Sequence, residues 1–118
     1  MLFRSVRISV EAAGVQLAVD AAIPCGLIVN ELITNALKHA FPNGKRGKIV
    51  IKLNREADET VTLSVSDNGI GISEELDLVN TGTLGLQLVS LLTEQLGGVM
   101  TVHRSNPTNF VLKLTVES

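Results

Sequence analysis

The polar side chains best suited to chemistry lie on one helical segment of this sequence. At about 100° per residue, Glu31, Asn35, Lys38 and His39 fall within about a third of the circumference of a helix. Side chains of these types bind charged ligands and exchange protons in many proteins. The same stripe could be the solvated face of the helix, and pattern alone favours that reading. The amides Asn30 and Asn35 argue against it, because exposed helix positions prefer Lys, Glu or Arg.

A carboxylate continues an apolar face in the middle of the chain. Asp67 follows the alternating Val61, Leu63 and Val65, so it points toward the apolar layer of the predicted strand. A buried carboxylate needs a polar partner, which makes Asp67 a candidate ligand contact. Alternatively, the strand ends one residue earlier and Asp67 only begins a turn, which is a common use of aspartate.

Glycines are spaced unusually on both sides of residues 73–81. Gly69 and Gly71 are one residue apart, and Gly82 and Gly85 precede or open a helical pattern. Such glycines let the backbone approach a ligand closely, and a helix N-terminus after a glycine favours an anion. This pattern therefore adds a second candidate binding segment to the polar helix.

Several familiar sites are excluded by spacing. Glu74 stands where a dinucleotide fingerprint needs its third glycine, and residues 44–48 lack the spacing of a P-loop. Residues 67–76 lack the ligand ladder of an EF-hand. Cys25 is the single cysteine, which excludes an internal disulfide and a zinc site built from cysteines, and we expect it in the core.

The hydrophobic pattern predicts the elements that position these residues. Alternation indicates a hairpin with one buried face, formed by strands 6–10 and 15–19 about a turn at Gly14. The remaining prediction consists of helices at 20–40 and 84–96, strands at 48–54, 60–67, 99–104 and 109–117, and an irregular segment at 73–83 with a short helix. Because most strands alternate, we expect an α/β two-layer sandwich with a mixed, mostly antiparallel sheet and helices on one face.

Length and composition set the remaining limits. The 118 residues suit a single domain spanning 1–118, and ten basic against twelve acidic residues give a net charge of −2. Weak basic clustering and 3% aromatic residues argue against nucleic-acid binding. No apolar stretch is long enough to span a membrane and no signal peptide is evident, so we expect a cytoplasmic protein, or a cytoplasmic part of a larger one, without direct membrane contact.

Together these features resemble the nucleotide site of the GHKL ATPases, the superfamily that includes gyrase and the histidine kinases. Residues 30–41 (NELITNALKHAF) resemble the N box, residues 67–71 (DNGIG) the G1 box, and residues 83–89 (TLGLQLV) the G2 box. The run 96–98 (LGG) before a strand is similar to the end of a histidine-kinase catalytic domain. The wording of the N box looks most like the HWE and HisKA_2 subgroups. The resemblance implies the Bergerat, or GHKL, ATPase fold.

For the phosphate end of a nucleotide, the resemblance implies magnesium and a set of contacts. It makes Asn35 a Mg²⁺ ligand, with Lys38 and His39 near the phosphates. An amide oxygen and phosphate oxygens are hard ligands that suit octahedral magnesium. Glu31 lies one helical turn before Asn35, where gyrase-like members carry the glutamate that activates a nucleophile, so it is the candidate general base.

For the base and the lid, the resemblance implies further residues. Asp67 would accept a hydrogen bond from the exocyclic amine of adenine, which selects adenine over guanine. Thr108 is a weaker candidate for a second adenine contact. The glycines of the boxes and the start of the second helix would lie close to the base, ribose and phosphates, namely Gly69, Gly71, Gly82, Gly85 and Leu86.

The chain also departs from the family pattern. The glycine run of the G2 box is short, and residues 73–79 contain no phenylalanine for an F box. No helical hairpin with a phosphoacceptor histidine is present. His39 lies in the N box and His103 reads as an ordinary strand residue, so neither is expected to be the acceptor.

The sequence therefore predicts the catalytic ATP-binding domain of a sensor histidine kinase. Its partners would be ATP, the phosphoacceptor helical domain and, downstream, a response regulator, and it would not autophosphorylate alone. The alternative is a serine kinase of the anti-sigma-factor type, which binds a sigma factor and phosphorylates its antagonist. A nucleotide-binding module without catalysis is a third reading, and Glu31, Asn35 and Asp67 argue against it.

Overall fold

The computed structural model describes residues 6–12, 14–42, 46–56, 59–73 and 84–115. In these residues the chain forms β1 (Val6–Ala12), α1 (Val19–His39), β2 (Gly47–Arg55), β3 (Thr60–Asp67), α2 (Leu84–Gln95), β4 (Val99–His103) and β5 (Thr108–Thr115). Both long helices and the strands β2 to β5 lie where the sequence predicts them, with small differences at their ends. The short helix predicted within residues 73–83 falls almost wholly outside the described residues.

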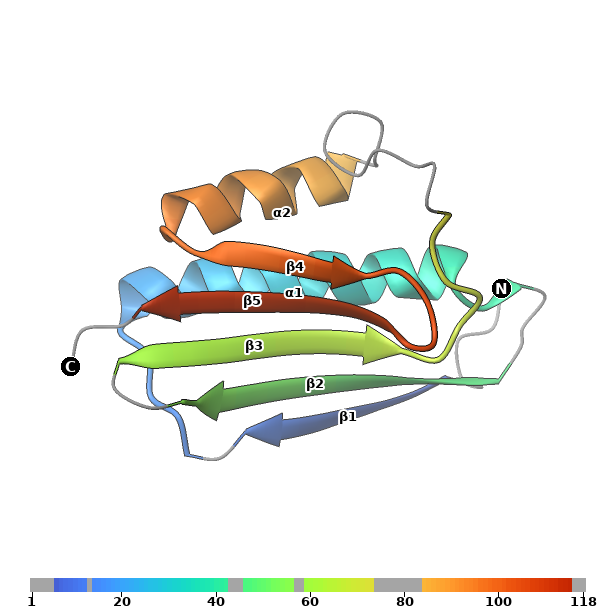
Figure 1. Ribbon diagram of the computed structural model, residues 1–118, viewed down its shortest axis with the longest axis horizontal. Coiled ribbons are helices and arrows are strands. Elements are labelled where there is room, and N and C mark those ends of the chain that lie inside the picture. Colours follow the sequence, from blue (N-terminus) through green and yellow to red (C-terminus); the bar gives the residue numbers. More distant parts are fainter. Residues whose placement is uncertain (1–5, 13, 43–45, 57–58, 74–83, 116–118) are drawn as a thin grey trace.

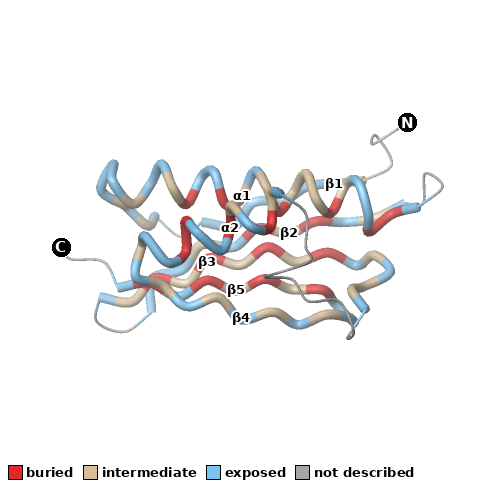
Figure 2. Tube along the Cα trace, turned by 90° about the horizontal axis from the view of Figure 1, so that it is seen from above, coloured by how far each residue is buried: buried red, intermediate tan, exposed pale blue. Residues whose placement is uncertain are grey.

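The described strands form one sheet in the order β1-β2-β3-β5-β4. β1 and β2 are parallel, and every other neighbouring pair is antiparallel. Both helices lie on the same face of this sheet (Figures 1 and 2). The predicted fold class, an α/β two-layer sandwich with a mixed, mostly antiparallel sheet, is confirmed.

The predicted N-terminal hairpin is wrong. Residues 14–18 form no strand, and β1 pairs in parallel with β2 instead. A parallel pair needs a crossover connection, and α1 supplies it between the two strands. Val15 and Leu17 alternate because they pack partly buried against the core as the chain crosses to the helical layer.

The core lies between the sheet and the two helices. Its most deeply buried side chains are Ile28 from α1, Ile49 from β2, Val61 from β3 and Leu112 from β5, each at 1% exposure or less. The single cysteine, Cys25, is buried in the same cluster, as predicted. Aliphatic side chains of this kind supply most of the burial that stabilises the domain, because aromatic residues are scarce.

One apolar face predicted to be buried is open. Ile8 and Val10 of β1 are 47% and 66% exposed, although their register partners Ile49 and Ile51 are buried. β1 is an edge strand, and α1 packs over β2 and β3 farther into the sheet. The alternation of β1 therefore reports which way its side chains point and not how well they are covered.

Candidate functional site

Asp67 and Thr108 lie opposite each other where β3 ends and β5 begins. They are register partners, and only 8% and 3% of their surfaces are exposed. Both face the helical layer, because they continue the alternation that buries Val65 and Phe110 on that face. A cavity of about 40 Å³ lies beside them against α1. The predicted inward orientation of Asp67 is confirmed, and the reading as a turn residue alone is wrong.

The Asp67 carboxylate is partly satisfied from within its own loop. Its Oδ1 accepts a hydrogen bond from the backbone N–H of Gly69 at 2.9 Å. Burial raises the pKa of Asp67, and the bond from Gly69 lowers it by a smaller amount. A carboxylate has two acceptor oxygens, so capacity remains for a donor in the cavity.

Thr108 is oriented by the turn that precedes it. Its hydroxyl donates to the backbone carbonyl of Arg104 at 3.1 Å. With its proton used in this way, the Thr108 oxygen can meet a ligand only as an acceptor. Asp67 and Thr108 therefore present two acceptors side by side.

Arg104 connects the β4–β5 turn to the loop after β3, and sequence reasoning missed it. Its carbonyl also accepts from the N–H of Ile72 at 2.7 Å, and its guanidinium Nη1 donates to the carbonyl of Ser73. These bonds fix the loop that forms one wall of the small cavity, which Gly71 and Ile72 line. A backbone carbonyl is identical in every residue, so no sequence signal could have identified this role.

Two glycines of the predicted G1 box are required by close packing. A Cβ on Gly69 would lie 2.4 Å from the Ala40 carbonyl oxygen, where α1 ends. Gly71 has a φ of +87°, and a Cβ there would lie 2.8 Å from the Arg104 carbonyl oxygen. Gly71 lines the small cavity, whereas the contact of Gly69 holds the loop against α1. A role for Gly69 beside the base stays a prediction.

The polar stripe of α1 faces a second cavity of about 180 Å³. Glu31, Asn35, Lys38 and His39 line it together with Gly85 at the start of α2. Asn35 and His39 line the small cavity as well, so the two hollows adjoin along α1. The stripe therefore lines a cavity between the two helices, and its role in binding stays a prediction.

For two predicted site residues, Gly82 and Leu86, the structure gives no direct support. Gly82 lies outside the described residues. Leu86 is buried, and its side chain lines a different cavity, between α2 and β4. Its predicted place near phosphates, through the backbone at the start of α2, stays a prediction.

The donor set fits a magnesium ion that arrives with a nucleotide. Among the described residues, no group of three or more His, Cys, Asp and Glu side chains could hold a metal by itself. The amide of Asn35 and the carboxylate of Glu31 are hard oxygen donors beside the larger site cavity. Mg²⁺ commonly keeps several waters and takes one or two protein oxygens plus substrate phosphates.

Comparison with known proteins identifies the family. Residues 20–118 match the family described as histidine kinase-, DNA gyrase B- and HSP90-like ATPases. The chain belongs to this family. The predicted GHKL membership is confirmed, and the boxes seen in the sequence lie within the matched region.

Individual relatives are sensor histidine kinases. The chain is 34% identical over 107 residues to blue-light-activated histidine kinase 2 of Erythrobacter litoralis, covering 91% of this chain and 31% of that protein. It is 33% identical over 101 residues to the sensor histidine kinase PdtaS of Mycobacterium tuberculosis, covering 82% and 20%. The chain therefore spans less than a third of the length of these relatives.

Solved structures of histidine kinases share the fold of this chain. The histidine kinase domain of the Erythrobacter litoralis EL346 blue-light-activated kinase matches with a TM-score of 0.87 at 32% identity, over 95% of this chain and 55% of that one. The Acinetobacter baumannii histidine kinase AdeS matches with a TM-score of 0.80 at 22% identity, over 97% and 56%, which shows the shared fold alone.

Among the described residues, no helix is long and apolar enough to cross a membrane.

Proposed function

We propose that this chain binds Mg-ATP and donates its γ-phosphate to a histidine on a separate helical domain, in two-component signalling. The observation that carries the proposal is the pair of facing acceptors, Asp67 and Thr108, at one end of two adjoining cavities. The polar stripe of α1 lies along the same cavities. The similar proteins are named as histidine kinases, which favours this function over a serine kinase of the anti-sigma type.

The buried end of the site suits adenine. The exocyclic amine of adenine is a donor, and Asp67 and Thr108 offer acceptors side by side. Guanine places a carbonyl oxygen at the equivalent position, so it would face acceptors with an acceptor. A site built around such a hydrogen bond rejects the wrong partner because buried groups are then left unpaired.

The open end of the site suits the phosphates. Lys38 and His39 are exposed donors beside Gly85, where the N-terminus of α2 adds its own preference for anions. Magnesium bound by Asn35 and the phosphates would neutralise developing charge during transfer. Glu31, half-buried one turn earlier, would take the proton released by the attacking imidazole.

The phosphoacceptor would come from another domain. The two histidines of this chain lie within the proposed ATP-binding fold itself, His39 at the end of α1 and His103 at the end of β4. We therefore propose that residues 1–118 are one catalytic domain, that its direct partner is a helical domain with an acceptor histidine, and that a response regulator receives the phosphate afterwards.

Calorimetry tests the nucleotide assignment directly. With Mg²⁺ present, we expect ATP to bind the 118-residue chain at least about tenfold more tightly than GTP, a difference of about 1.4 kcal/mol. Labelled ATP should then transfer phosphate to the helical domain of a sensor histidine kinase supplied in trans. Equal affinity for ATP and GTP, or no binding of either, would contradict the proposal.

A further inference from the structure

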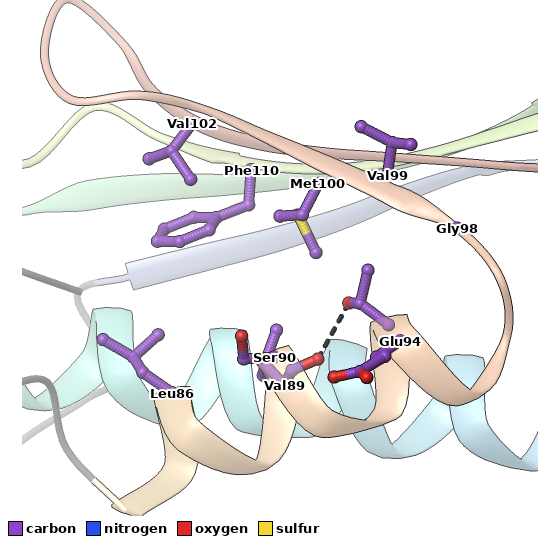
Figure 3. Close-up of a pocket in the computed structure, with 10 residues that line it drawn as sticks. Leu86, Val89, Ser90, Glu94, Gly98, Val99, Met100, Val102 and Phe110 are labelled. Carbon is purple, nitrogen blue, oxygen red and sulfur yellow. Dashed lines mark hydrogen bonds between the residues drawn. The ribbon is translucent and has the colours of Figure 1, made fainter. Parts of the chain in front are cut away.

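A further cavity in the described part of the chain is lined mostly by residues outside the proposed nucleotide site. It has a volume of about 450 Å³ and opens between α2 and β4. Val89 on α2 faces Met100 and Val102 on β4 and Phe110 on β5, as Figure 3 shows. Cavities of this size with mostly apolar walls are typical of binding sites.

The few polar groups of this cavity lie along α2. The Thr93 hydroxyl donates to the Val89 carbonyl at 2.8 Å, which uses its proton within the helix. Ser90 is exposed on the cavity side, and Glu94 is the charged side chain in the lining. An occupant would therefore be apolar along its length, with a positive group near Glu94.

The strand that forms the other wall is an unprotected sheet edge. β4 has one neighbour among the described strands, β5, and pairs with it over five consecutive residues without a bulge. The sequence of β4 has no Lys, Arg, Asp, Glu or Pro, and Val99 is 66% exposed. Proteins usually protect an edge with charge, proline or a bulge, and β1 at the opposite edge carries Arg7 and Glu11.

An edge strand beside a groove under a helix matches one known mode of peptide recognition. An added strand takes affinity from backbone hydrogen bonds to the edge and specificity from alternate side chains that enter adjacent pockets. Met100 and Val102 alternate on the cavity side of β4, so every second residue of an added strand would enter the same apolar space.

We propose that β4 and this cavity bind an extended peptide segment of a partner protein. The segment adds a strand along β4, places alternate aliphatic side chains between α2 and β4, and sets a lysine or arginine beside Glu94. This binding is independent of the proposed nucleotide chemistry. Phe110 lines both this cavity and the small cavity beside Asp67, so the two sites share a wall.

Nuclear magnetic resonance on the nucleotide-free chain tests this proposal. The probe is the capped peptide acetyl-KTVTVTV-amide, whose lysine and valines share one face of an extended strand, titrated to about 1 mM, the weak end of useful affinities. We expect shifts of the backbone amides of β4 and of the Met100 and Val102 methyl groups, with contacts between the peptide and β4 backbones. No shifts at this concentration, or a peptide bound as a helix, would overturn the proposal.

Matched variants locate the peptide. Ser90→Phe fills the cavity from α2 and should weaken binding at least about tenfold, whereas Gln87→Phe, an exposed α2 residue outside the lining, should not. Glu94→Gln should weaken the lysine peptide but not its glutamine analogue, which keeps the test decisive if Ser90→Phe fails to fold. Equal binding by wild type, Ser90→Phe and Glu94→Gln would overturn the proposal. Concentration-dependent β4 shifts without peptide would assign the edge to a second copy instead.

Discussion

At the scale of single residues, the burial of Asp67 disfavours its charged form and so costs folding free energy. Because burial raises its pKa, the folded state holds a proton over a pH range in which the unfolded state has lost it. The free energy of unfolding therefore falls as the pH rises from the ordinary aspartate pKa through the raised one. We expect thermal unfolding scans of Asp67→Asn to lose this pH dependence, with stability at neutral pH at least equal to that of wild type.

The same substitution should damage nucleotide binding. Asp67→Asn can still accept from Gly69, but its amide can turn a donor toward the donor of adenine. We expect ATP affinity to fall by about 2 kcal/mol, the scale of a buried unpaired group. Calorimetry at neutral pH measures this loss, and a variant that is both stable and unchanged in ATP affinity would refute the adenine contact.

Asn35 should act at the other end of the ligand. It is half-buried and lines both cavities, and the proposed role is to bind magnesium on the phosphates. Asn35→Ala should therefore weaken Mg-ATP by about tenfold or more, while adenosine affinity changes little. Adenosine is the control for folding, because an equal loss for both ligands would show damage to the whole site.

A substitution at Glu31 should affect ATP binding and phosphate transfer differently. Glu31→Gln keeps the size and polarity of the side chain but removes the base, so ATP binding should survive. Transfer to a helical domain in trans should fall by a factor of about 10² to 10⁴, the usual contribution of a positioned base. Single-turnover transfer measures this directly, and an unchanged rate would leave Glu31 with a structural role only.

At the scale of elements, the contact between the loop after β3 and the end of α1 is tight. The Ile70 N–H donates to the Ala40 carbonyl at 3.0 Å, and a Cβ on Gly69 would lie 2.4 Å from that oxygen. Gly69→Ala should therefore destabilise the fold by about 1 to 3 kcal/mol through overpacking, and separate the two halves of the site.

A second glycine provides the matched control. Gly26 lies within α1, and a Cβ there would meet nothing within 4 Å. Gly26→Ala should stabilise the fold by about 0.5 to 1 kcal/mol, because alanine favours a helix over glycine. Urea unfolding of both variants measures the contrast, and a shift of the same sign in both would contradict the packing argument.

Alternation and helical period were sufficient to predict the elements with strong patterns. β3 buries every second residue from Val61 to Asp67, so the inward direction of Asp67 could be read from sequence. The same alternation failed at Val15 and Leu17, because partly buried residues of a connection can alternate without strand partners. Pattern reports the direction of side chains, whereas pairing depends on the parallel crossover through α1.

The residues of the candidate site also fall into two groups, those that could be predicted from the sequence and those that could not. The stripe of α1 and the glycines could be found from residue type and spacing, since chemistry and backbone freedom restrict those residues. The pairing of Asp67 with Thr108 depends on the register of two strands that are joined through α2 and β4. The Arg104 carbonyl that orients Thr108 depends on backbone position alone. Such long-range placement is a property of the folded sheet and has no local sequence signal.

At the scale of the whole molecule, the two histidines are placed where neither suits phosphate transfer. His39 is exposed at the end of α1, and it lines both cavities along the side of the proposed ligand. In-line transfer needs the nucleophile beyond the γ-phosphorus, opposite the leaving oxygen. His103 pairs with Asn109, next to Thr108, but faces away from the helical layer because Val102 faces toward it.

The chain alone should therefore bind Mg-ATP without labelling itself. Transfer depends mainly on positioning, so a nearby but misaligned imidazole cannot replace the missing acceptor. Incubation of the 118-residue chain with γ-labelled ATP should give no acid-labile label, and a helical acceptor domain added in trans should take the label alone. A double variant, His39→Gln with His103→Gln, is the control for any label on the chain itself, because it removes both histidines. Rapid stoichiometric label on the wild-type chain that this variant removes would place the acceptor within residues 1–118 and contradict the proposed division between domains.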